Sequence, residues 1–381
     1  MPATEAASDL RVGQEVEVDV LRVAHGGHCI AHFGGRTLFV RHALPGERVL
    51  ARITQVSRKI VRADAIRVLW PSPSRVEAPC RWAAPGACGG CDLQHVLPAA
   101  QRDWKTEVLR SSLARFAGLD PELPPVGTCS VEQLPGSADG LHWMTRVRWA
   151  TAADGTRGLR GHRSHEVVPV DHCLIAEERI DSPDTHAAPT TVRQVRHRRW
   201  EVPAPVFWQV HHALPEALVG EVLDQGRPEA GETWWDLFSG AGLMAAFLGE
   251  AVGAGGAVVA VESDAAAVGC GEEALADLPM VQFVRADVDA WIHDRPSGDA
   301  TSAPAGIVVD PPRSGAGEGL MCRLLAVRPS RLVYVACDPV ALARDARVAM
   351  TCGYRLERLR AFDAFPMTHH FESVALFVPD S

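Results

Sequence analysis

Apolar and polar residues alternate over several short stretches near the start of the chain. The stretch EVEVDVLRV, at residues 15–23, shows this alternation, and RTLFV, RVLARI and VRADAIRVL follow it. Glycine pairs and a Pro-Gly dipeptide separate the stretches, as turns do. Several short strands within about 60 residues predict a small β-barrel of the oligonucleotide-binding type over residues 11–70.

The second half of the chain has a different pattern. From about residue 231, short apolar stretches alternate with Ala-rich segments. Six stretches are strand-like: TWWDLF, AVVAVE, VQFVRAD, AGIVVDPP, RLVYVACDP and SVALFV. The segments between them are long enough for helical crossovers, so the pattern predicts a parallel α/β sheet.

A middle region separates these two parts. It begins with the proline-rich linker WPSPSRVEAP, and a cysteine cluster and a helical pattern from about Ala99 to Ala117 follow. The stretches LHWMTRVRWAT and EVVPV are candidate strands. We therefore expect four parts: a disordered N-terminus (1–10), the barrel (11–70), a central domain (71–205) and an α/β domain (206–381).

The composition excludes several classes of protein. The 381 residues are 47% hydrophobic and 22% charged, which is typical of globular rather than disordered or fibrous chains. No apolar run approaches the roughly 20 residues of a membrane span. The N-terminal MPATEAASDL lacks the basic and apolar regions of an export signal. We expect a cytoplasmic protein without membrane contact, in which clustered cysteines indicate metal binding or catalysis rather than disulfides.

The net charge of −9 argues, taken alone, against a nucleic-acid-binding protein. Its distribution changes this interpretation. Residues 11–75 carry 11 basic and five acidic residues, whereas residues 232–299 carry two basic and 12 acidic ones. The N-terminal part can attract phosphates, although such an asymmetry is also common on ordinary solvated surfaces.

A glycine-rich loop, Asp236-Leu-Phe-Ser-Gly240-Ala-Gly242, follows a predicted strand and opens a predicted helix. Its glycines let the backbone approach a ligand closely. Glu262 ends the next strand, where a carboxylate can bind ribose hydroxyls, and Asp287 ends the following one, where it can meet an adenine amino group. The loop lacks the lysine of a P-loop, so its acidic rim favours a cationic nucleoside cofactor without phosphates, such as S-adenosylmethionine. The alternative is that these acids are helix N-caps.

Three more motifs follow predicted strands: DPPR at 310–313, CDP at 337–339, and FPMTHHFESV at 365–374, which precedes the last strand. In open α/β sheets, ligands bind outside the carboxyl ends of the strands. Cys337 is therefore placed where a nucleophile would be useful, although most single cysteines are inert core residues.

These motifs carry a resemblance. DLFSGAG, VFWQV, DPPR, ACDP followed by ALARD, and FPMTHHFESV resemble the motif series of the RNA uracil-5-methyltransferase family, which makes 5-methyluridine in ribosomal and transfer RNA. The barrel resembles that family's TRAM domain. The resemblance implies a Rossmann-like class I methyltransferase domain, an N-terminal OB-like β-barrel and a small central domain with an iron–sulfur motif.

The resemblance also implies roles for individual residues. Cys337 would add to carbon 6 of uracil and so activate carbon 5, and Glu372 would later remove the carbon 5 proton as general base. Asp310 would bind or polarise the uracil edge. The residues implied in cofactor binding are Gln209, Asp236, Phe238, Gly240, Gly242, Glu262, Asp287 and Asp310.

Alternatives remain at this stage. Asp338, His369 and His370 are other candidate acids or bases, which we interpret as surface or loop-stabilising residues. Amino-group methylation of a base often uses an aromatic residue where this chain has Arg313, and it would leave Cys337 and Glu372 without roles. A non-catalytic RNA-binding assembly protein with a vestigial methyltransferase domain is a further alternative, which the intact candidate residues argue against.

The cysteine cluster has its own chemistry. Cys80, Cys88 and Cys91 lie within 12 residues, and CGGCDLQH resembles the iron–sulfur motif of the family's ribosomal RNA members, with Cys173 in the context of the fourth ligand. Four thiolates suit a [4Fe–4S] cluster or zinc, and the resemblance favours iron–sulfur. Seven residues separate Cys80 from Cys88, where the family motif has five.

The expected partner is RNA, and the four cysteines favour ribosomal over transfer RNA. By resemblance, Arg146 and Arg148 contact the RNA, from one face of the predicted strand around Trp143. The chain is expected to act as a monomer.

Overall fold

The computed structural model describes residues 10–181, 190–293 and 303–380. These residues form two compact units. The first contains residues 10–108, 137–181 and 365–370, and the second contains 109–136, 190–293, 303–364 and 371–380. Residues 1–9 of the expected disordered N-terminus lie outside the described residues, whereas Leu10 is buried in the barrel core.

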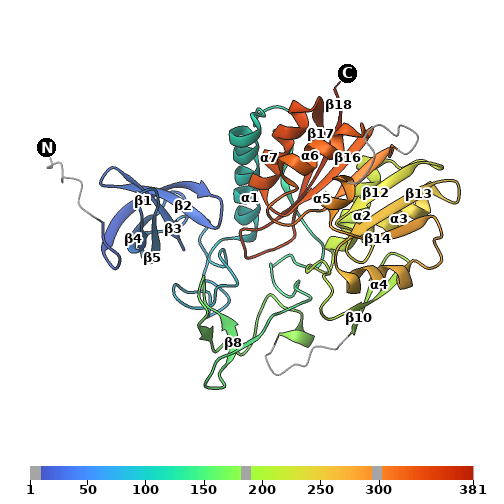
Figure 1. Ribbon diagram of the computed structural model, residues 1–381. Coiled ribbons are helices and arrows are strands. Elements are labelled where there is room, and N and C mark those ends of the chain that lie inside the picture. Colours follow the sequence, from blue (N-terminus) through green and yellow to red (C-terminus); the bar gives the residue numbers. More distant parts are fainter. Residues whose placement is uncertain (1–9, 182–189, 294–302, 381) are drawn as a thin grey trace. The chain divides into compact units, whose positions relative to one another are not determined.

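Five strands of the first unit close a barrel in the order β1-β2-β3-β5-β4 (Figure 1). They are β1 (Glu15–Ala24), β2 (His28–Phe33), β3 (Arg36–Arg41), β4 (Arg48–Val56) and β5 (Val61–Trp70). The alternation read from the sequence has its structural counterpart in β1, where Val16, Val18 and Val20 are buried and the acidic residues between them are not. The predicted barrel is confirmed.

The rest of the first unit contains little regular structure. Helix α1 (Pro98–Ser112) begins in it and continues into a π-helical turn, Leu113–Ala117, as the periodic pattern predicted. A small sheet has the order β7-β8-β9 and consists of β7 (Ala150–Thr151), β8 (Arg157–Arg160) and β9 (Val167–Val168). A short 3-10 turn, Glu178–Ile180, follows.

The prediction of a strand at LHWMTRVRWAT is wrong for most of that stretch, because only Ala150 and Thr151 belong to a strand. The preceding residues form a loop whose backbone is hydrogen-bonded to a second loop. The N–H groups of His142 and Met144 donate to the carbonyls of Leu174 and Ile175. The apolar alternation there reflects burial against a loop rather than pairing in a sheet.

The second unit is built on an eight-stranded sheet in the order β14-β13-β12-β15-β16-β18-β17-β6. Its strands are β6 (Val131–Gln133), β12 (Thr233–Leu237), β13 (Ala257–Glu262), β14 (Val281–Arg285), β15 (Gly306–Val309), β16 (Arg331–Ala336), β17 (Tyr354–Asp363) and β18 (Glu372–Pro379). Its helices are α2 (Leu214–Gly226), α3 (Leu243–Val252), α4 (Ala265–Ala274), α5 (Val288–His293), α6 (Gly317–Ala326) and α7 (Pro339–Thr351). A hairpin of β10 (Thr190–Val195) and β11 (Arg198–Pro203) completes it.

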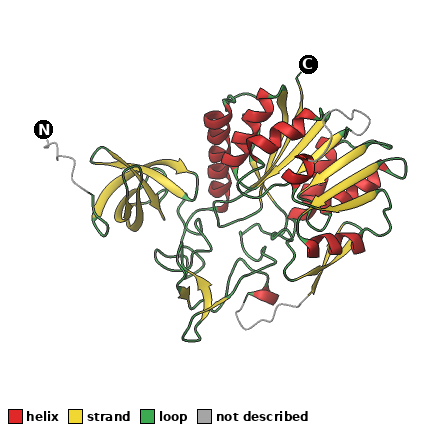
Figure 2. Cartoon of the chain, viewed as in Figure 1, coloured by secondary structure: helices red, strands yellow, loops and turns green. Residues whose placement is uncertain are grey.

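The sheet reverses its strand order between β12 and β15. From β12 the chain moves to β13 and β14, and it then returns to β15 and β16 on the other side of β12. Because parallel crossovers are right-handed, α3 and α4 cover one face of the sheet and the helices after β14 cover the other. Figure 2 shows helices on either side of these strands. The predicted Rossmann-like α/β fold is confirmed.

The sheet is not wholly parallel, contrary to the expectation. β18 pairs antiparallel with both β16 and β17. The reason is the short connection, since β17 and β18 are joined by residues 364–371 without a crossover helix, which parallel strands would need. No helix within the described ranges is long and apolar enough to cross a membrane.

Candidate active site

The candidate residues of the second unit gather at the carboxyl ends of its parallel strands. Asp236 lies in β12, Asp310 follows β15 directly and Cys337 follows β16 directly. Glu372 is the first residue of β18, which runs the opposite way. In the β16–β18 pairing Ala336 faces Ser373, and this register brings Cys337 to the level of Glu372.

The glycine-rich loop after β12 has backbone geometry suited to a ligand. Phe238 has a φ of +60°, a left-handed conformation that non-glycine residues adopt only where the surroundings enforce it. Gly242 has a φ of +77°, and a Cβ there would lie 2.6 Å from the Phe283 ring. The Oγ of Ser239, which the sequence analysis did not single out, is buried without a hydrogen-bond partner among the described residues.

Asp236 anchors this loop. One carboxylate oxygen accepts a hydrogen bond of 2.8 Å from the Ala245 N–H in the first turn of α3. The other oxygen, Oδ1, is buried and finds no partner in the part of the chain that the structure describes. The pKa of Asp236 is raised to about 8. Burial is the main cause, and the nearby carboxylates of Asp310 and Glu262 add to the rise. The loop end therefore brings three carboxyl groups, those of Asp236, Asp310 and Glu262, within electrostatic reach of one another.

Glu262 and Asp287 both accept hydrogen bonds from backbone amides, but the helix-cap alternative fits only Asp287 of the two, because the N-cap of α4 is Asp264. Glu262 accepts hydrogen bonds from the N–H groups of Gly240 at 3.0 Å, Ser263 at 2.7 Å and Asp264 at 2.8 Å. Asp287 accepts one of 3.0 Å from Ala290 at the start of α5. The carboxylate of Glu262 thus ties the glycine-rich loop to the end of β13.

Gln209 and Asp310 meet across a long stretch of sequence. The side-chain amide of Gln209 donates to Oδ2 of Asp310 at 3.4 Å. Burial raises the pKa of Asp310 to about 7. The VFWQV segment therefore contributes a neutral polar group to the edge of the sheet where Asp310 lies.

The carboxylate of Glu372 affects the ionisation of Cys337. Burial raises the pKa of Cys337 to about 12, with the carboxylates of Glu372 and Asp310 adding to the rise and Arg313 opposing it. Glu372 is 3% exposed. Burial, together with the charge of Asp310, raises its pKa well above the ordinary value, and Arg313 again opposes the rise. Arg313 is thus the cation of this group, a role that its position in DPPR did not reveal.

Two further aspartates support the loops of the site. Asp338 accepts hydrogen bonds from Val340 and Ala341 and so caps α7, which confirms its interpretation as a loop-stabilising residue. Asp345, the last residue of ALARD, is 3% exposed. Its carboxylate accepts hydrogen bonds from Ala316 N–H at 2.8 Å and Tyr334 O–H at 2.5 Å. The sequence could have revealed this role of Asp345, because an acidic residue on the apolar face of a helix indicates a buried carboxylate with hydrogen-bond partners.

The four predicted metal-ligating cysteines lie in the first unit. Cys80, Cys88, Cys91 and Cys173 all line one cavity of about 350 Å³. Burial raises the pKa of Cys91 well above the ordinary value, and the three other thiols add to the rise. Within the described residues, no three His, Cys, Asp or Glu side chains are close enough to hold a single metal ion. The structure thus brings the four cysteines to one cavity.

The long loop between Cys80 and Cys88 is absorbed by turns. Ala83 N–H donates to the Cys80 carbonyl, and Cys88 N–H donates to the Trp82 carbonyl. Arg81 donates to Asp171 at 2.6 Å, two residues before Cys173. The longer loop therefore folds into turns and stays tied to the segment of the fourth cysteine.

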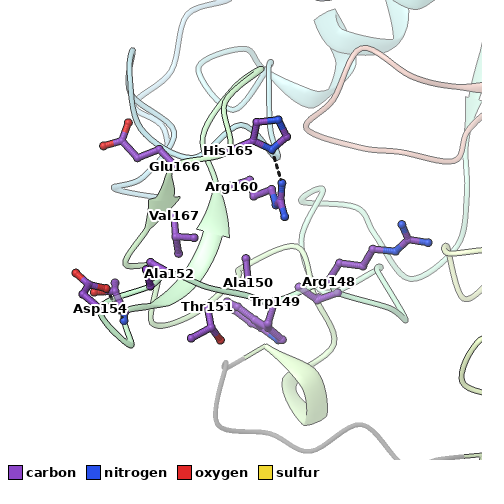
Figure 3. A pocket seen from close by; sticks show the side chains of 13 residues that line it. Arg148, Trp149, Ala150, Thr151, Ala152, Asp154, Arg160, His165, Glu166 and Val167 are labelled. Atoms are coloured by element: carbon purple, nitrogen blue, oxygen red, sulfur yellow. Dashed lines mark hydrogen bonds between the residues drawn. The ribbon is translucent and has the colours of Figure 1, made fainter.

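The predicted RNA-contacting arginines border this cavity. Arg146 is half-buried, Arg148 is exposed, and both line the cysteine cavity together with Arg160 and Arg163. Arg148 also lines a second cavity of about 1220 Å³ over β7, β8 and β9. Figure 3 shows the guanidinium of Arg148 pointing away from Asp154, which lines the same cavity. The surface around the cysteines is basic.

Comparison with known proteins identifies the class to which this fold and site belong. A TRAM domain model matches residues 9–66, and a tRNA (Uracil-5-)-methyltransferase model matches residues 301–378. The fold resembles the crystal structure of the tRNA (uracil-54, C5)-methyltransferase of Pyrococcus abyssi in complex with S-adenosyl-L-homocysteine. The TM-score is 0.67 at 21% identity, over 95% of this chain and 99% of that one.

Two relatives extend over nearly the whole length. An RNA methyltransferase of Streptomyces avermitilis is 40% identical, with 97% of this chain and 99% of the relative covered. The 23S rRNA (uracil(1939)-C(5))-methyltransferase of Pseudomonas putida is 31% identical, with 96% and 94% covered. The chain belongs to the RNA uracil-5-methyltransferase family.

Proposed function

We propose that the protein transfers a methyl group from S-adenosylmethionine to carbon 5 of a uridine in 23S ribosomal RNA. The observation that carries this proposal is the β16–β18 register. It sets the thiol of Cys337 level with the carboxyl of Glu372 at the strand ends where Asp310 also lies. A nucleophile and a base facing one reaction centre is the arrangement that methylation at carbon 5 requires.

The glycine-rich loop fits the proposed cofactor. Oδ1 of Asp236 and Oγ of Ser239, which have no hydrogen-bond partner in the described part of the chain, offer buried polar groups beside a left-handed backbone. Asp310 and Glu262 raise the pKa of Asp236, so a cationic ligand relieves a repulsion that this loop otherwise bears. We assign cofactor binding to this loop and to Gln209, Phe238, Glu262 and Asp287. S-adenosylmethionine supplies an electrophilic methyl group on a cationic sulfur.

Cys337 would act as the nucleophile. Carbon 5 of uracil is too weakly nucleophilic to take the methyl group directly. Addition of a thiolate to carbon 6 produces an enolate that makes carbon 5 reactive. Burial raises the pKa of Cys337 to about 12, which favours the protonated and less nucleophilic thiol. The Arg313 cation and a bound sulfonium both favour the thiolate, which ties activation of Cys337 to occupation of the site.

Glu372 would complete the reaction. After methyl transfer, carbon 5 still bears its proton, and this proton must leave before the Cys337–carbon 6 bond can break. Burial raises the pKa of Glu372, and a carboxylate with a raised pKa is a stronger base than an exposed one. Asp310, with Gln209 as its hydrogen-bond donor, is placed to bind the uracil edge. A stacked uridine must first be flipped out of the RNA.

We further propose that Cys80, Cys88, Cys91 and Cys173 hold a [4Fe–4S] cluster. In support, all four cysteines line one cavity of about 350 Å³. The cluster would brace the loops around it, because methyl transfer needs no redox step. Anaerobic purification with iron, sulfide and zinc analysis tests this assignment. Stoichiometric zinc without sulfide would overturn it.

The choice of 23S ribosomal RNA rests on the four-cysteine set and on relatives such as the Pseudomonas putida enzyme. Arg146, Arg148 and the barrel would contact its phosphates. The test is incubation with S-adenosylmethionine and unmodified 23S ribosomal RNA or transfer RNA, followed by nucleoside mass spectrometry. We expect 5-methyluridine in the ribosomal RNA. Its appearance in transfer RNA alone would transfer the assignment to the alternative substrate. Absence of both cofactor binding and methylation would indicate a vestigial domain.

A further inference from the structure

The segment that leads into Glu372 contains a residue held in a strained conformation. Met367, five residues before Glu372, has a φ of +64° and is 4% exposed. A left-handed conformation at a non-glycine residue persists only where its surroundings determine it, and such residues cluster at functional sites. The contacts of Met367 therefore identify what shapes this segment.

Both backbone groups of Met367 are held by residues of the first unit. Its N–H donates to Oε1 of Gln101 at 2.9 Å. Its carbonyl accepts hydrogen bonds of 3.0 Å from the N–H groups of Asp92 and Leu93, which directly follow Cys91. Gln101 is 1% exposed, and its amide donates to the carbonyls of Leu93 and Val96, so it also fixes the cysteine loop.

Two side chains hold the neighbours of Met367. Lys105, which is 2% exposed, donates to the carbonyl of Phe365 at 3.1 Å. His369 Nδ1 lies 2.6 Å from Oδ2 of Asp92, and Oδ1 of Asp92 pairs with Arg41 of the barrel at 3.3 Å. Residues 365–370 are thus fixed at three points, by helix α1 and by the loop that carries Cys91.

We propose that Gln101, Lys105 and Asp92 are positioning residues for Glu372. They set the path of residues 365–370 and thereby where Glu372 enters β18. This inference rests on the proposed function of Glu372. It gives the cysteine motif a part in the reaction, because the amides that hold Met367 belong to its loop. We call the contacts of Gln101, Lys105 and Asp92 with residues 365–370 the clamp. Loosening the clamp should slow removal of the carbon 5 proton, while cofactor binding stays unchanged.

The test compares four full-length variants: Gln101→Ala, Gln101→Ala with Met367→Gly, Lys105→Met, and Gln282→Ala. Glycine adopts a left-handed conformation without steric cost. If Gln101 acts by holding Met367, glycine at that position should therefore restore much of the lost activity. Lys105→Met removes a different contact of the same segment. Gln282, an exposed residue of β14, provides the matched control.

We expect Gln101→Ala and Lys105→Met to lower kcat at least tenfold, with the Kd for S-adenosylmethionine within twofold of the unaltered protein. A denaturation-stable RNA adduct should accumulate, because the methylated complex waits for its base. Hydrogen exchange of the amides at 365–373 should become faster, and Met367→Gly should recover kcat several-fold in the Gln101→Ala background.

Two results would overturn the proposal. One is unchanged hydrogen exchange at 365–373, since no clamp would then exist. The other is faster exchange with normal kcat and no adduct, since the clamp would then position nothing. The variant Glu372→Gln is measured alongside. Full activity in that variant would remove the proposed base, whereas the exchange data would still report on the clamp.

A second inference comes from two cysteines of the second unit. Cys322 in α6 and Cys352 at the end of α7 are both exposed, and their sulfur atoms lie 3.9 Å apart. A disulfide joins its sulfurs at about 2 Å, so the two thiols are already near bonding distance. We propose that this pair is a site of reversible oxidation. With glutathione disulfide as oxidant, the two thiols lose two protons and two electrons, and two glutathione molecules are released.

The measurement is peptide mass spectrometry after incubation with glutathione disulfide. We expect a Cys322–Cys352 cross-linked peptide in the unaltered protein that dithiothreitol removes, and none in Cys322→Ser. If the two residues stay reduced, or carry only separate glutathione adducts, the proposal is wrong.

Discussion

The side-chain amide of Gln209 lies 3.4 Å from the carboxylate of Asp310, although 101 residues separate them along the chain. This contact joins the VFWQV segment to the DPPR loop. We predict that Gln209→Leu lowers kcat/KM for RNA roughly 10- to 100-fold, as expected for loss of a hydrogen bond to a charged group. Steady-state kinetics with Gln282→Ala as the control tests this. Unchanged kinetics would mean that the contact is incidental.

Asp236 should make the free energy of unfolding depend on pH. Its pKa is about 8 in the folded chain, against 3.8 ordinarily, so between these values the folded state keeps a proton that the unfolded state has lost. Folded protein then binds more protons, and stability must fall as pH rises from about 4 to 8. Urea unfolding at several pH values should show this decline, and Asp236→Asn should make it shallower, because Asp310 and Glu372 also have raised pKa values. Parallel curves for the two proteins would contradict the assignment.

Asp345 should stabilise the loop after DPPR. Replacement by Asn leaves Ala316 N–H and Tyr334 O–H competing for a weaker, neutral acceptor in a buried place. We expect a loss of about 1–3 kcal/mol in the free energy of unfolding, together with lower activity. Urea titration against the exposed control Glu318→Gln measures the stability cost. A change no larger than that of the control would exclude the structural role.

RNA affinity should depend steeply on salt. Arg58 and Lys59 are exposed between β4 and β5 of the barrel. If both contact phosphates, changing both to Gln should make the slope of log K against log salt shallower by roughly 1.5 to 2. Filter binding over a salt series tests this, with the exposed Arg347→Gln of α7 as the control. An equal slope in both variants would place the RNA elsewhere.

Much of this architecture follows from local sequence pattern. The alternation in β1 predicted the barrel, and the apolar stretches predicted β12 to β16 and β18, because side-chain periodicity records which face is buried. The strand-end positions of Asp310 and Cys337 followed from the same strands. Their assignment to catalysis and to the cofactor remains a proposal, which the geometry supports.

Other features depend on pairing that local sequence does not encode. The antiparallel placement of β18 is decided by the short link from β17, and no periodicity distinguishes it from a parallel strand. The loop around Arg146 looked like a strand because burial against another loop produces a similar pattern. The left-handed Met367 gave no signal, since its conformation is imposed by Gln101 and Asp92, which are distant in sequence.

The central claim is that Cys337 and Glu372 act in sequence on one uridine. The most direct measurement follows unmodified 23S ribosomal RNA incubated with S-adenosylmethionine and the unaltered protein, Cys337→Ala or Glu372→Gln, by nucleoside mass spectrometry and denaturing gel. We predict 5-methyluridine from the unaltered protein and none from Cys337→Ala, with a stable protein–RNA adduct from Glu372→Gln. Normal 5-methyluridine formation by Cys337→Ala would contradict the account.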